Sequence, residues 1–342
     1  MIHLSTSDDD LAQAGEIIRG GGLVAFPTET VYGLGANALD AEACARIYAA
    51  KGRPSDNPLI VHLDAPEGLA RYVSQLPERA RPLLNKFWPG PLTVILKKSA
   101  AIPLQVTGGL DTVAIRIPGN DTARRLIGAA GVPVAAPSAN VSGRPSPTSA
   151  RHVLSDLSGK IDAVVDGGPC AFGIESTIID LSEDPPRLLR PGPLTLSQLE
   201  SLLRHKIAPS PASTDAPKAP GMKYAHYAPD AKLIIVTGDD NKVVRYIGEA
   251  CKGSNLPPDK LGIFVSAETA PLYTGIGAQI IPAGSRADLP SIARSLYASL
   301  RRFDDMALSL VYSESFHDTE LGLSIMNRLE KAAGGSGSVV KV

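Results

Sequence analysis

Short apolar runs rich in β-branched residues alternate with amphipathic segments along most of this chain, and this alternation limits its fold most strongly. Each run is as short as a typical buried strand. The amphipathic segments carry helix signals; segment 8–20, for example, begins with acidic residues and ends at glycine. Strands and helices that alternate in this way form α/β domains, in which helices cover a central sheet.

The N-terminal part of the chain is expected to form a twisted mixed sheet with helices. Its strand-like runs are 23–26, 59–63, 92–96, 112–117, 132–136, 163–166 and 176–181. Its helix-like segments are 8–20, 40–52, 76–88 and 120–131. No obvious helix precedes 112–117 or 176–181, so not every strand can follow a helical crossover. We therefore expect parallel and antiparallel pairs in one sheet.

A proline-rich stretch, residues 206–229, divides the chain into two domains. It contains five prolines and many alanines and serines, and it has no hydrophobic periodicity. Such a composition predicts an extended, semi-rigid linker between residues 1–205 and 230–342. The part after it has strand-like runs at 232–238, 261–266, 278–284 and 307–314, and helix-like segments at 241–251, 289–306 and 321–333. This pattern predicts a smaller, Rossmann-like open α/β domain.

Charge and cysteine content exclude several classes of protein. The net charge is −1, divided as −2 over 1–205 and +1 over the remainder, so neither half has the basic excess of a nucleic-acid-binding domain. The three cysteines are far apart without a CxxC pair, which argues against a disulfide framework or a zinc site. No apolar run approaches the roughly 18 residues of a membrane span. We expect a cytoplasmic protein.

Common catalytic signatures are absent: there is no P-loop, no dinucleotide fingerprint after a strand, no nucleophile elbow and no HExxH.

The first unusual piece is 27–35, where Thr30 and a neighbouring threonine follow a strand and precede two glycines. Hydroxyls beside such glycines suit a small polar ligand. The alternative is an ordinary connection in which a threonine caps the next helix.

The second piece is 51–62, which places two cations and an amide in a turn stiffened by two prolines. Lys51 and Arg53 could together neutralise a polyphosphate, and the arginine offers a planar donor fork to it. The prolines also fix the backbone around Asn57. The alternative is that the two cations lie near a helix C-terminus, where the helix dipole favours positive charge. From local sequence alone, His62 is a core histidine on an apolar strand.

The third piece is Arg116, which lies within the otherwise apolar run 112–117. A buried guanidinium is costly unless it is paired, so it needs a carboxylate from the protein or from a ligand. Glu29 and Glu175 are the internal candidates. The alternative to a ligand site is a purely structural ion pair.

Two further stretches bring small polar side chains to strand ends. Ser138 and Ser146 lie in the loop-like segment 136–149, which could also be an ordinary surface loop. Ser176 opens one strand and Arg190 closes another. No catalytic triad or carboxylate pair emerges. Hydroxyls and arginines at strand ends favour the binding and alignment of anionic substrates over covalent catalysis by the protein.

Taken in order, these pieces resemble the YrdC/Sua5 family. The resemblance rests on "PTETVYGLG", "KGRPSDNPLIVH", "RIP", "PSANVSGRPSPT" and "GIESTIID…LLRPG". The stretches "PGMKYAHYAP" and "LGLSIMNRL" are similar to the longer, two-domain Sua5 branch. The resemblance implies synthesis of L-threonylcarbamoyladenylate from L-threonine, bicarbonate or CO2, and ATP, with release of pyrophosphate. The product then serves the N6-threonylcarbamoyl modification of adenosine 37 in tRNA.

The resemblance also implies roles for individual positions. The implied ATP-binding set is Lys51, Arg53, Asn57, Thr112, Ser138, Ser146, Arg190 and Tyr224. The implied threonine-binding set is Thr30, His62, Arg116, Ala136 and Ser176. Lys51 and Arg53 would act in catalysis, and Tyr224 would fold back from the linker over the nucleotide. Ala225 stands where the family usually has a basic residue.

Mg2+ is expected to arrive with ATP, without dedicated protein ligands. The expected partners are the substrates and, indirectly, tRNA and the proteins that transfer the product to it. Two other functions stay open: an RNA-binding module, and a transferase that acts through a carbamoyl adenylate.

Overall fold

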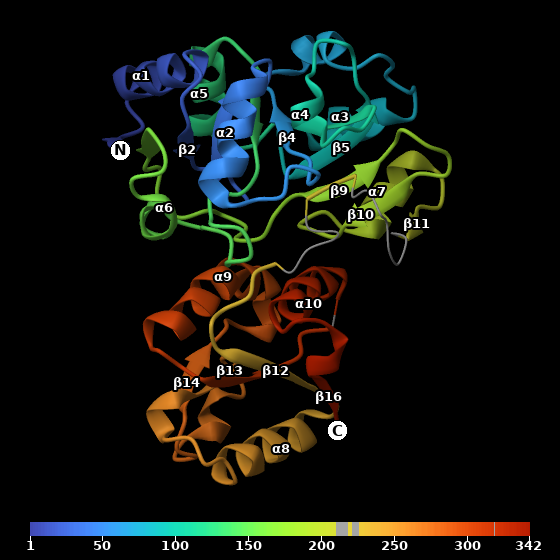
Figure 1. Cartoon of the computed structure of the whole chain (residues 1–342). Helices are drawn as coiled ribbons and strands as arrows, with labels where there is room; N and C mark the ends of the chain where they lie inside the picture. The colour runs from blue at the N-terminus through green and yellow to red at the C-terminus, as the bar shows by residue number, and fades with distance from the viewer. Residues whose placement is uncertain (210–217, 221–225, 318) are drawn as a thin grey trace. The chain divides into compact units, whose positions relative to one another are not determined.

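The computed structural model describes residues 1–209, 218–220, 226–317 and 319–342. The chain forms two compact units (Figure 1). The first comprises Met1–Ser142 and Ser146–Tyr224, and the second comprises Gly143–Pro145 and Ala225–Val342. The predicted linker 206–229 is therefore divided between the two units. Its residues 210–217 and 221–225 lie outside the described part of the chain.

The described residues of the first unit form an eleven-stranded sheet in the order β1-β8-β2-β3-β7-β4-β6-β5-β9-β10-β11. The sheet is mixed, as predicted. Its strands are β1 (Ile2–Leu4), β2 (Val24–Phe26), β3 (Gly33–Asn37), β4 (Ile60–His62), β5 (Leu92–Lys97), β6 (Thr112–Arg116), β7 (Val134–Ala136), β8 (Ala163–Val165), β9 (Thr177–Asp180), β10 (Arg187–Arg190) and β11 (Ala208–Pro209). Strands β4 and β6 are parallel, whereas β7 and β5 run antiparallel to them.

Helices cover both faces of this sheet. They are α1 (Asp8–Arg19), α2 (Ala41–Lys51), α3 (Ala80–Phe87), α4 (Leu104–Thr107), α5 (Asp121–Ala130), α6 (Ala150–Leu157) and α7 (Leu196–Leu203), with a 3-10 turn η1 (Pro66–Arg71). Helices α1 and α5 share one hydrophobic cluster with β2, β7 and β8, and they lie together in Figure 1. The other helices bury apolar residues in a larger cluster on the opposite face.

The face that carries α1 and α5 continues beyond them as a smaller apolar cluster. This cluster contains Ile60, Ile95, Ala114, Ile178, Leu189 and Ala219. Ile60 is paired in register with both Ala114 and Ala136, so its strand neighbours present side chains on the same face. Ala219, from the described part of the predicted linker, is fully buried in this cluster.

The second unit is a small open sheet, as predicted, and all strand pairs among its described residues are parallel. The order is β14-β13-β15-β12-β16. Its strands are β12 (Lys232–Thr237), β13 (Leu261–Val265), β14 (Gln279–Pro282), β15 (Leu310–Glu314) and β16 (Val339–Lys341). Its main helices are α8 (Asp240–Lys252), α9 (Leu289–Asp305) and α10 (Glu320–Ala332), and short 3-10 turns lie at 258–260, 270–273, 286–288 and 336–338. Helix α8 covers one face of the sheet, and α9 and α10 cover the other (Figure 1).

Several elements differ from the sequence prediction. Strands β1, β3, β11 and β16 and helices α4, α6 and α7 were not predicted. The segment predicted as a helix over 76–88 is helical only at Ala80–Phe87, because Pro77 and the residues after it form a turn.

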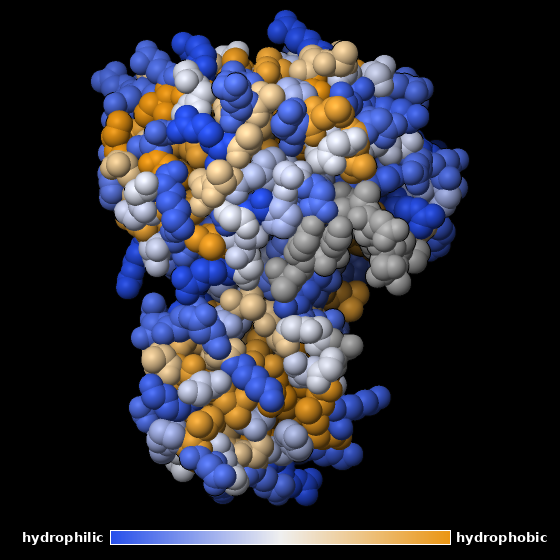
Figure 2. Space-filling model, viewed as in Figure 1, coloured by the Kyte–Doolittle hydropathy of each residue, from blue (hydrophilic) through white to orange (hydrophobic). Residues whose placement is uncertain are grey.

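Hydrophilic residues cover much of the visible surface of each unit (Figure 2). No helix in the described ranges is both long and apolar enough to cross a membrane.

Candidate active site

A row of paired residues crosses five strands of the first unit and collects three of the predicted site residues. His62 on β4 is paired with Arg116 on β6, and Arg116 is paired with Thr93 on β5. Thr93 is paired with Ile178 on β9, and Ile178 is paired with Arg190 on β10. Paired residues on adjacent strands project to the same face of a sheet. His62, Arg116 and Arg190 therefore share one face although they are far apart in the sequence.

Two more predicted residues lie on this face because side chains alternate along a strand. Thr112 is four residues before Arg116 on β6 and therefore has the same orientation. Ala136, at the end of β7, is paired with Ile60, which is two residues before His62. Both positions are buried. This face is the one that carries the small apolar cluster with Ala219.

Arg116 is held by the protein from three sides and is only 3% exposed. Its Nε donates to the Gly90 carbonyl over 3.2 Å, and its Nη1 donates to Thr30 Oγ1 over 2.8 Å. Its Nη2 lies 2.7 Å from Glu29 Oε1 in a buried ion pair. The predicted carboxylate partner of Arg116 is thus Glu29, which belongs to the same segment as Thr30. Neutralisation by this carboxylate offsets the free-energy cost of burying the guanidinium.

Glu29 is ionised in this environment. Burial raises the pKa of its carboxyl group, but the Arg116 charge and a hydrogen bond from the Gly119 backbone N–H (2.9 Å) outweigh that effect. The net result is a pKa below the usual value. The Glu29–Arg116 pair is therefore a pair of full charges inside the protein.

His62 is uncharged. Burial, assisted by the neighbouring Arg116 charge, lowers its pKa to about 3. Its Nδ1 lies 3.1 Å from the Ile60 carbonyl oxygen, and its ring meets the Phe26 ring edge-on with 6.2 Å between centroids. A Cβ at Gly35 would lie 2.8 Å from Phe26, so this glycine leaves the space that the phenyl ring occupies. The prediction from local sequence that His62 is buried is correct.

Ser176 connects the row to Arg190. Its Oγ lies 2.7 Å from Thr93 Oγ1, and it accepts a hydrogen bond from Arg190 Nη2 over 3.1 Å. Arg190 Nε also donates to the Ser176 carbonyl, over 3.0 Å. All three side chains are almost fully buried. Arg190 is consequently oriented by Ser176, a predicted threonine-binding residue that immediately precedes β9.

The serine-rich loop after β7 is tied to the segment that contains Thr30. The Tyr32 backbone N–H donates to the Pro147 carbonyl, and the Ala139 N–H donates to the Tyr32 carbonyl. Within the loop, Ser146 is fully buried and donates from Oγ to Glu175 Oε1 over 2.6 Å. Glu175, the other candidate partner for Arg116, therefore bonds to this serine. The loop has a fixed structure and is not the plain surface loop considered as an alternative.

Lys51 lies at the C-terminal end of α2, where Gly52 adopts φ 60° and ends the helix. The side chain is 2% exposed, and its Nζ donates to the carbonyl oxygens of Ser138 (2.6 Å) and Asn140. The Lys51 carbonyl in turn accepts from the Ser142 N–H. The lysine therefore holds the start of the serine-rich loop, a role that local sequence did not indicate.

Arg53 and Asn57 lie together in the turn that follows α2. Arg53 donates from Nε to the Asn57 carbonyl (3.2 Å) and from Nη2 to the Pro58 carbonyl (3.0 Å). Asn57 is 2% exposed, and its Oδ1 is buried without a hydrogen-bond partner among the described residues. An unsatisfied buried acceptor is expensive for a structural residue and is usual where a ligand binds.

Part of the predicted linker contacts the same face. Lys218 Nζ lies 3.1 Å from Asp180 Oδ2, and Arg190 Nη1 lies 3.5 Å from the Pro220 carbonyl oxygen. Tyr224, predicted to fold over the nucleotide, lies outside the described residues, and so does Ala225.

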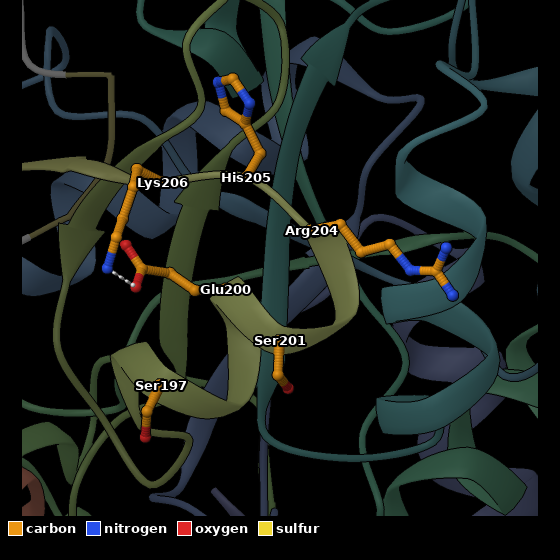
Figure 3. Close-up of a pocket in the computed structure, with 6 residues that line it drawn as sticks. All are labelled: Ser197, Glu200, Ser201, Arg204, His205 and Lys206. Atoms are coloured by element: carbon orange, nitrogen blue, oxygen red, sulfur yellow. Dashed lines mark hydrogen bonds and ion pairs between the residues drawn. The ribbon is translucent and has the colours of Figure 1, made fainter.

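A depression at the end of α7 is lined by Ser197, Glu200, Ser201, Arg204, His205 and Lys206 (Figure 3). Lys206 is paired there with Glu200, whereas Arg204 and His205 point away from that pair (Figure 3). The cations do not converge, so the depression is a poor anion site. The described part of the chain has no group of three or more His, Cys, Asp or Glu side chains arranged for a metal ion.

Sequence reasoning missed two contributors to the site, Thr93 and the backbone of Gly90. Thr93 lies inside an apolar run that reads as an ordinary core strand, and its position opposite Arg116 depends on strand order. Gly90 acts through its carbonyl oxygen, which no side-chain pattern reveals.

Both parts of the chain match models of known protein families. Residues 16–192 match the Sua5, YciO and YrdC family model, described as "Telomere recombination". Residues 194–334 match the model described as "Threonylcarbamoyl-AMP synthase, C-terminal domain".

Two curated relatives align over nearly the whole chain. The threonylcarbamoyl-AMP synthase of Bacillus subtilis is 47% identical over 97% of this chain and 95% of its own length. That of Pyrococcus abyssi is 48% identical over 94% and 93%. The crystal structure of P. abyssi Sua5 complexed with L-threonine matches with a TM-score of 0.92 and 45% identity, covering 100% of this chain and 99% of that one. Escherichia coli YciO matches 58% of this chain and 98% of its own, with a TM-score of 0.52 and 25% identity.

Proposed function

The chain belongs to the Sua5/YrdC family of threonylcarbamoyl-AMP synthases, and on this premise we propose how its buried polar face carries out that synthesis. The reaction joins L-threonine, CO2 from bicarbonate, and ATP, and it yields threonylcarbamoyl-AMP and pyrophosphate. As a reaction class, this is nucleotidyl transfer. The match along both units favours this function over an RNA-binding module or a carbamoyl-adenylate transferase.

The chemistry has two steps. The neutral threonine amine adds to CO2, which forms an N–C bond and releases a proton to give a carbamate. A carbamate oxygen then attacks the α-phosphorus of ATP, and the bond to the β-phosphate bridging oxygen breaks so that pyrophosphate leaves. Both reactants of the second step are anions, so their approach is opposed by Coulomb repulsion. The protein must supply positive charge and fixed orientation rather than a nucleophile.

Threonine is assigned to the part of the face around Arg116. The guanidinium would receive the threonine carboxylate, because buried arginines bind carboxylates through two parallel N–H donors. Thr30, His62, Ser176 and Ala136 would complete this pocket, as the family resemblance predicts. The uncharged state of His62 supports this assignment, because a neutral ring adds no further cation beside Arg116.

ATP is assigned to the residues that line the loops beside this pocket. Arg190, Lys51 and Arg53 would offset the phosphate charge, with Lys51 and Arg53 closest to the catalytic step. Asn57, whose buried Oδ1 lacks a partner, supports a ligand in this region. The remaining predicted contacts are Thr112, Ser138, Ser146 and Tyr224.

Mg2+ would enter with ATP as part of the substrate. The two buried glutamates of this region, Glu29 and Glu175, are already bonded to Arg116 and Ser146, respectively. The polar groups predicted to face ATP are cations, hydroxyls and an amide, which suit phosphate oxygens better than a bare metal ion. The ion would therefore keep phosphate and water ligands, as Mg2+ commonly does.

The product would serve the tRNA modification that the family supplies, through transferase proteins that act after this enzyme. A cytoplasmic location suits that role, and the three cysteines are buried free thiols, as expected in a reducing compartment.

The observation that carries the proposal is the pairing of His62, Arg116 and Thr93 across three strands. Ser176 is bonded to Thr93, and Arg190 is bonded to Ser176. The test is pyrophosphate release from ATP by the full chain, with threonine and bicarbonate omitted in turn. Release that requires both supports the synthase reaction. Release that is independent of threonine would reject it.

A further inference from the structure

The Glu29–Arg116 ion pair contains two buried polar atoms of opposite sign that lack hydrogen-bond partners among the described residues. Glu29 Oε1 accepts from the Gly119 N–H and lies against Arg116, but Glu29 Oε2 is buried and has no donor. Arg116 Nη2 lies 2.7 Å from Glu29 Oε1, yet the geometry does not make a hydrogen bond, so it too lacks a hydrogen-bonded acceptor. Native interiors contain few such atoms, and each calls for an explanation.

A purely structural ion pair does not explain both atoms. The side chain of Glu29 is 10% exposed and that of Arg116 is 4% exposed, so bulk water cannot satisfy them. An unmade hydrogen bond to a buried charged group is more costly than the usual 1–3 kcal/mol for a neutral group. The protein also orients both side chains firmly, through Gly90, Thr30 and Gly119. A firmly oriented carboxylate oxygen without a donor, beside a buried guanidinium, is the arrangement of a binding site.

The complementary ligand carries an anion and a cation close together. The α-carboxylate and α-ammonium groups of an amino acid meet this description, since they are attached to one carbon atom. With the carboxylate on Arg116, the ammonium group would be left beside Glu29. A buried ammonium needs an acceptor as much as a buried carboxylate needs a donor.

We propose that Glu29 is a substrate-binding residue whose Oε2 accepts a hydrogen bond from the α-ammonium group of the amino-acid substrate. The inference rests on the proposed function and extends it to one further residue. The protein's ion pair and the zwitterion would lie head to tail, so binding would add no net charge. The pair would select substrates that carry both groups. It would also fix the position of the nitrogen that later attacks CO2.

The electrostatics agree with this role. Glu29 is ionised, and its charge acts on the pKa of His62, one of the residues assigned to the threonine pocket. A carboxylate with a lowered pKa is a weak base. Glu29 would therefore hold the ammonium form and would not itself take its proton.

The test compares two ligands on two full-length proteins by calorimetry. L-Threonine carries the ammonium group, and (R)-3-hydroxybutyrate is the same molecule without it. For Glu29→Gln, which keeps the size and the acceptor for Gly119, we expect threonine affinity to fall by about 10- to 100-fold, the value of one hydrogen bond to a charged group. Affinity for (R)-3-hydroxybutyrate should not fall, because the substitution removes a negative charge beside the Arg116 contacts that bind its carboxylate.

An equal loss for both ligands would overturn the assignment, because it would mean that the substitution had only disturbed Arg116. Unchanged threonine affinity would overturn it as well. Glu29→Asp, which retains the charge, should bind threonine better than Glu29→Gln, and it provides a second variant if the amide folds poorly. Wild-type protein that does not bind threonine would instead reject the proposed function, so the two failures can be told apart.

Discussion

The buried, uncharged His62 predicts a specific loss of stability in acid. Its pKa is about 3 in the folded protein, whereas an unperturbed histidine has a pKa of 6.5. Between these values the unfolded chain binds a proton that the folded protein does not bind. The free energy of unfolding therefore falls as the pH falls below about 6.5.

The size of the effect follows from the two pKa values. Each pH unit in this window costs about 1.4 kcal/mol, so acidification from pH 7 to pH 5 should cost about 2 kcal/mol from this group alone. His62→Gln cannot titrate, and it should lack this part of the acid loss. The difference between the two proteins isolates His62, because the other titrating groups are common to both.

Trp88 provides a probe confined to the first unit. It is the single tryptophan of the chain, and it is buried in the main cluster of that unit. Urea unfolding followed by its fluorescence at pH 7 and pH 5 should show a loss larger by about 2 kcal/mol in wild type than in His62→Gln. Equal losses in the two proteins would refute the reasoning, and so would a folded-state His62 pKa near 6.5 measured by NMR.

Three further outcomes are expected. Arg53→Ala should lower ATP-dependent pyrophosphate release by orders of magnitude while leaving far-UV circular dichroism unchanged; near-normal release would exclude a role for Arg53 in catalysis. Gly35→Ala should destabilise the first unit by about 1–3 kcal/mol in urea unfolding, because its Cβ would lie 2.8 Å from Phe26 and from Val134; an unchanged midpoint would show that both neighbours can move. Ala219→Glu should raise the KM for ATP several-fold relative to Ala219→Ser. A charge cannot remain in that apolar cluster, so the linker segment would detach. Equal KM values would show that the linker takes no part in nucleotide binding.

The fold class could be predicted because it depends on patterns along the chain. Runs such as 112–117 and 176–181 became β6 and β9, and the lack of an obvious helix signal before them correctly indicated a mixed sheet, although the short α4 precedes β6. Strand β3 was missed because Gly33 and Gly35 weaken the local strand signal. Those glycines are explained only by the Phe26 ring packed against them, which is a tertiary cause.

Part of the site could be predicted from the free-energy cost of burying a charged side chain. A guanidinium on an apolar strand required a partner, and Glu29 was one of the two carboxylates considered. The choice between Glu29 and Glu175 depends on strand order and loop path, which no local pattern contains. Lys51 illustrates the same limit, because its carbonyl acceptors belong to a loop that starts far along the chain. The roles of the individual residues toward ATP and threonine remain predictions.

The most direct test of the central claim is to identify the product. The full chain, supplied with ATP, L-threonine and carbon-13 bicarbonate, is predicted to release an adenylate that contains threonine and one labelled carbon, together with an equal amount of pyrophosphate. Mass spectrometry of the reaction measures both. Formation of ADP and phosphate, or of an adenylate without the label, would contradict the assignment of this chain as a threonylcarbamoyl-AMP synthase.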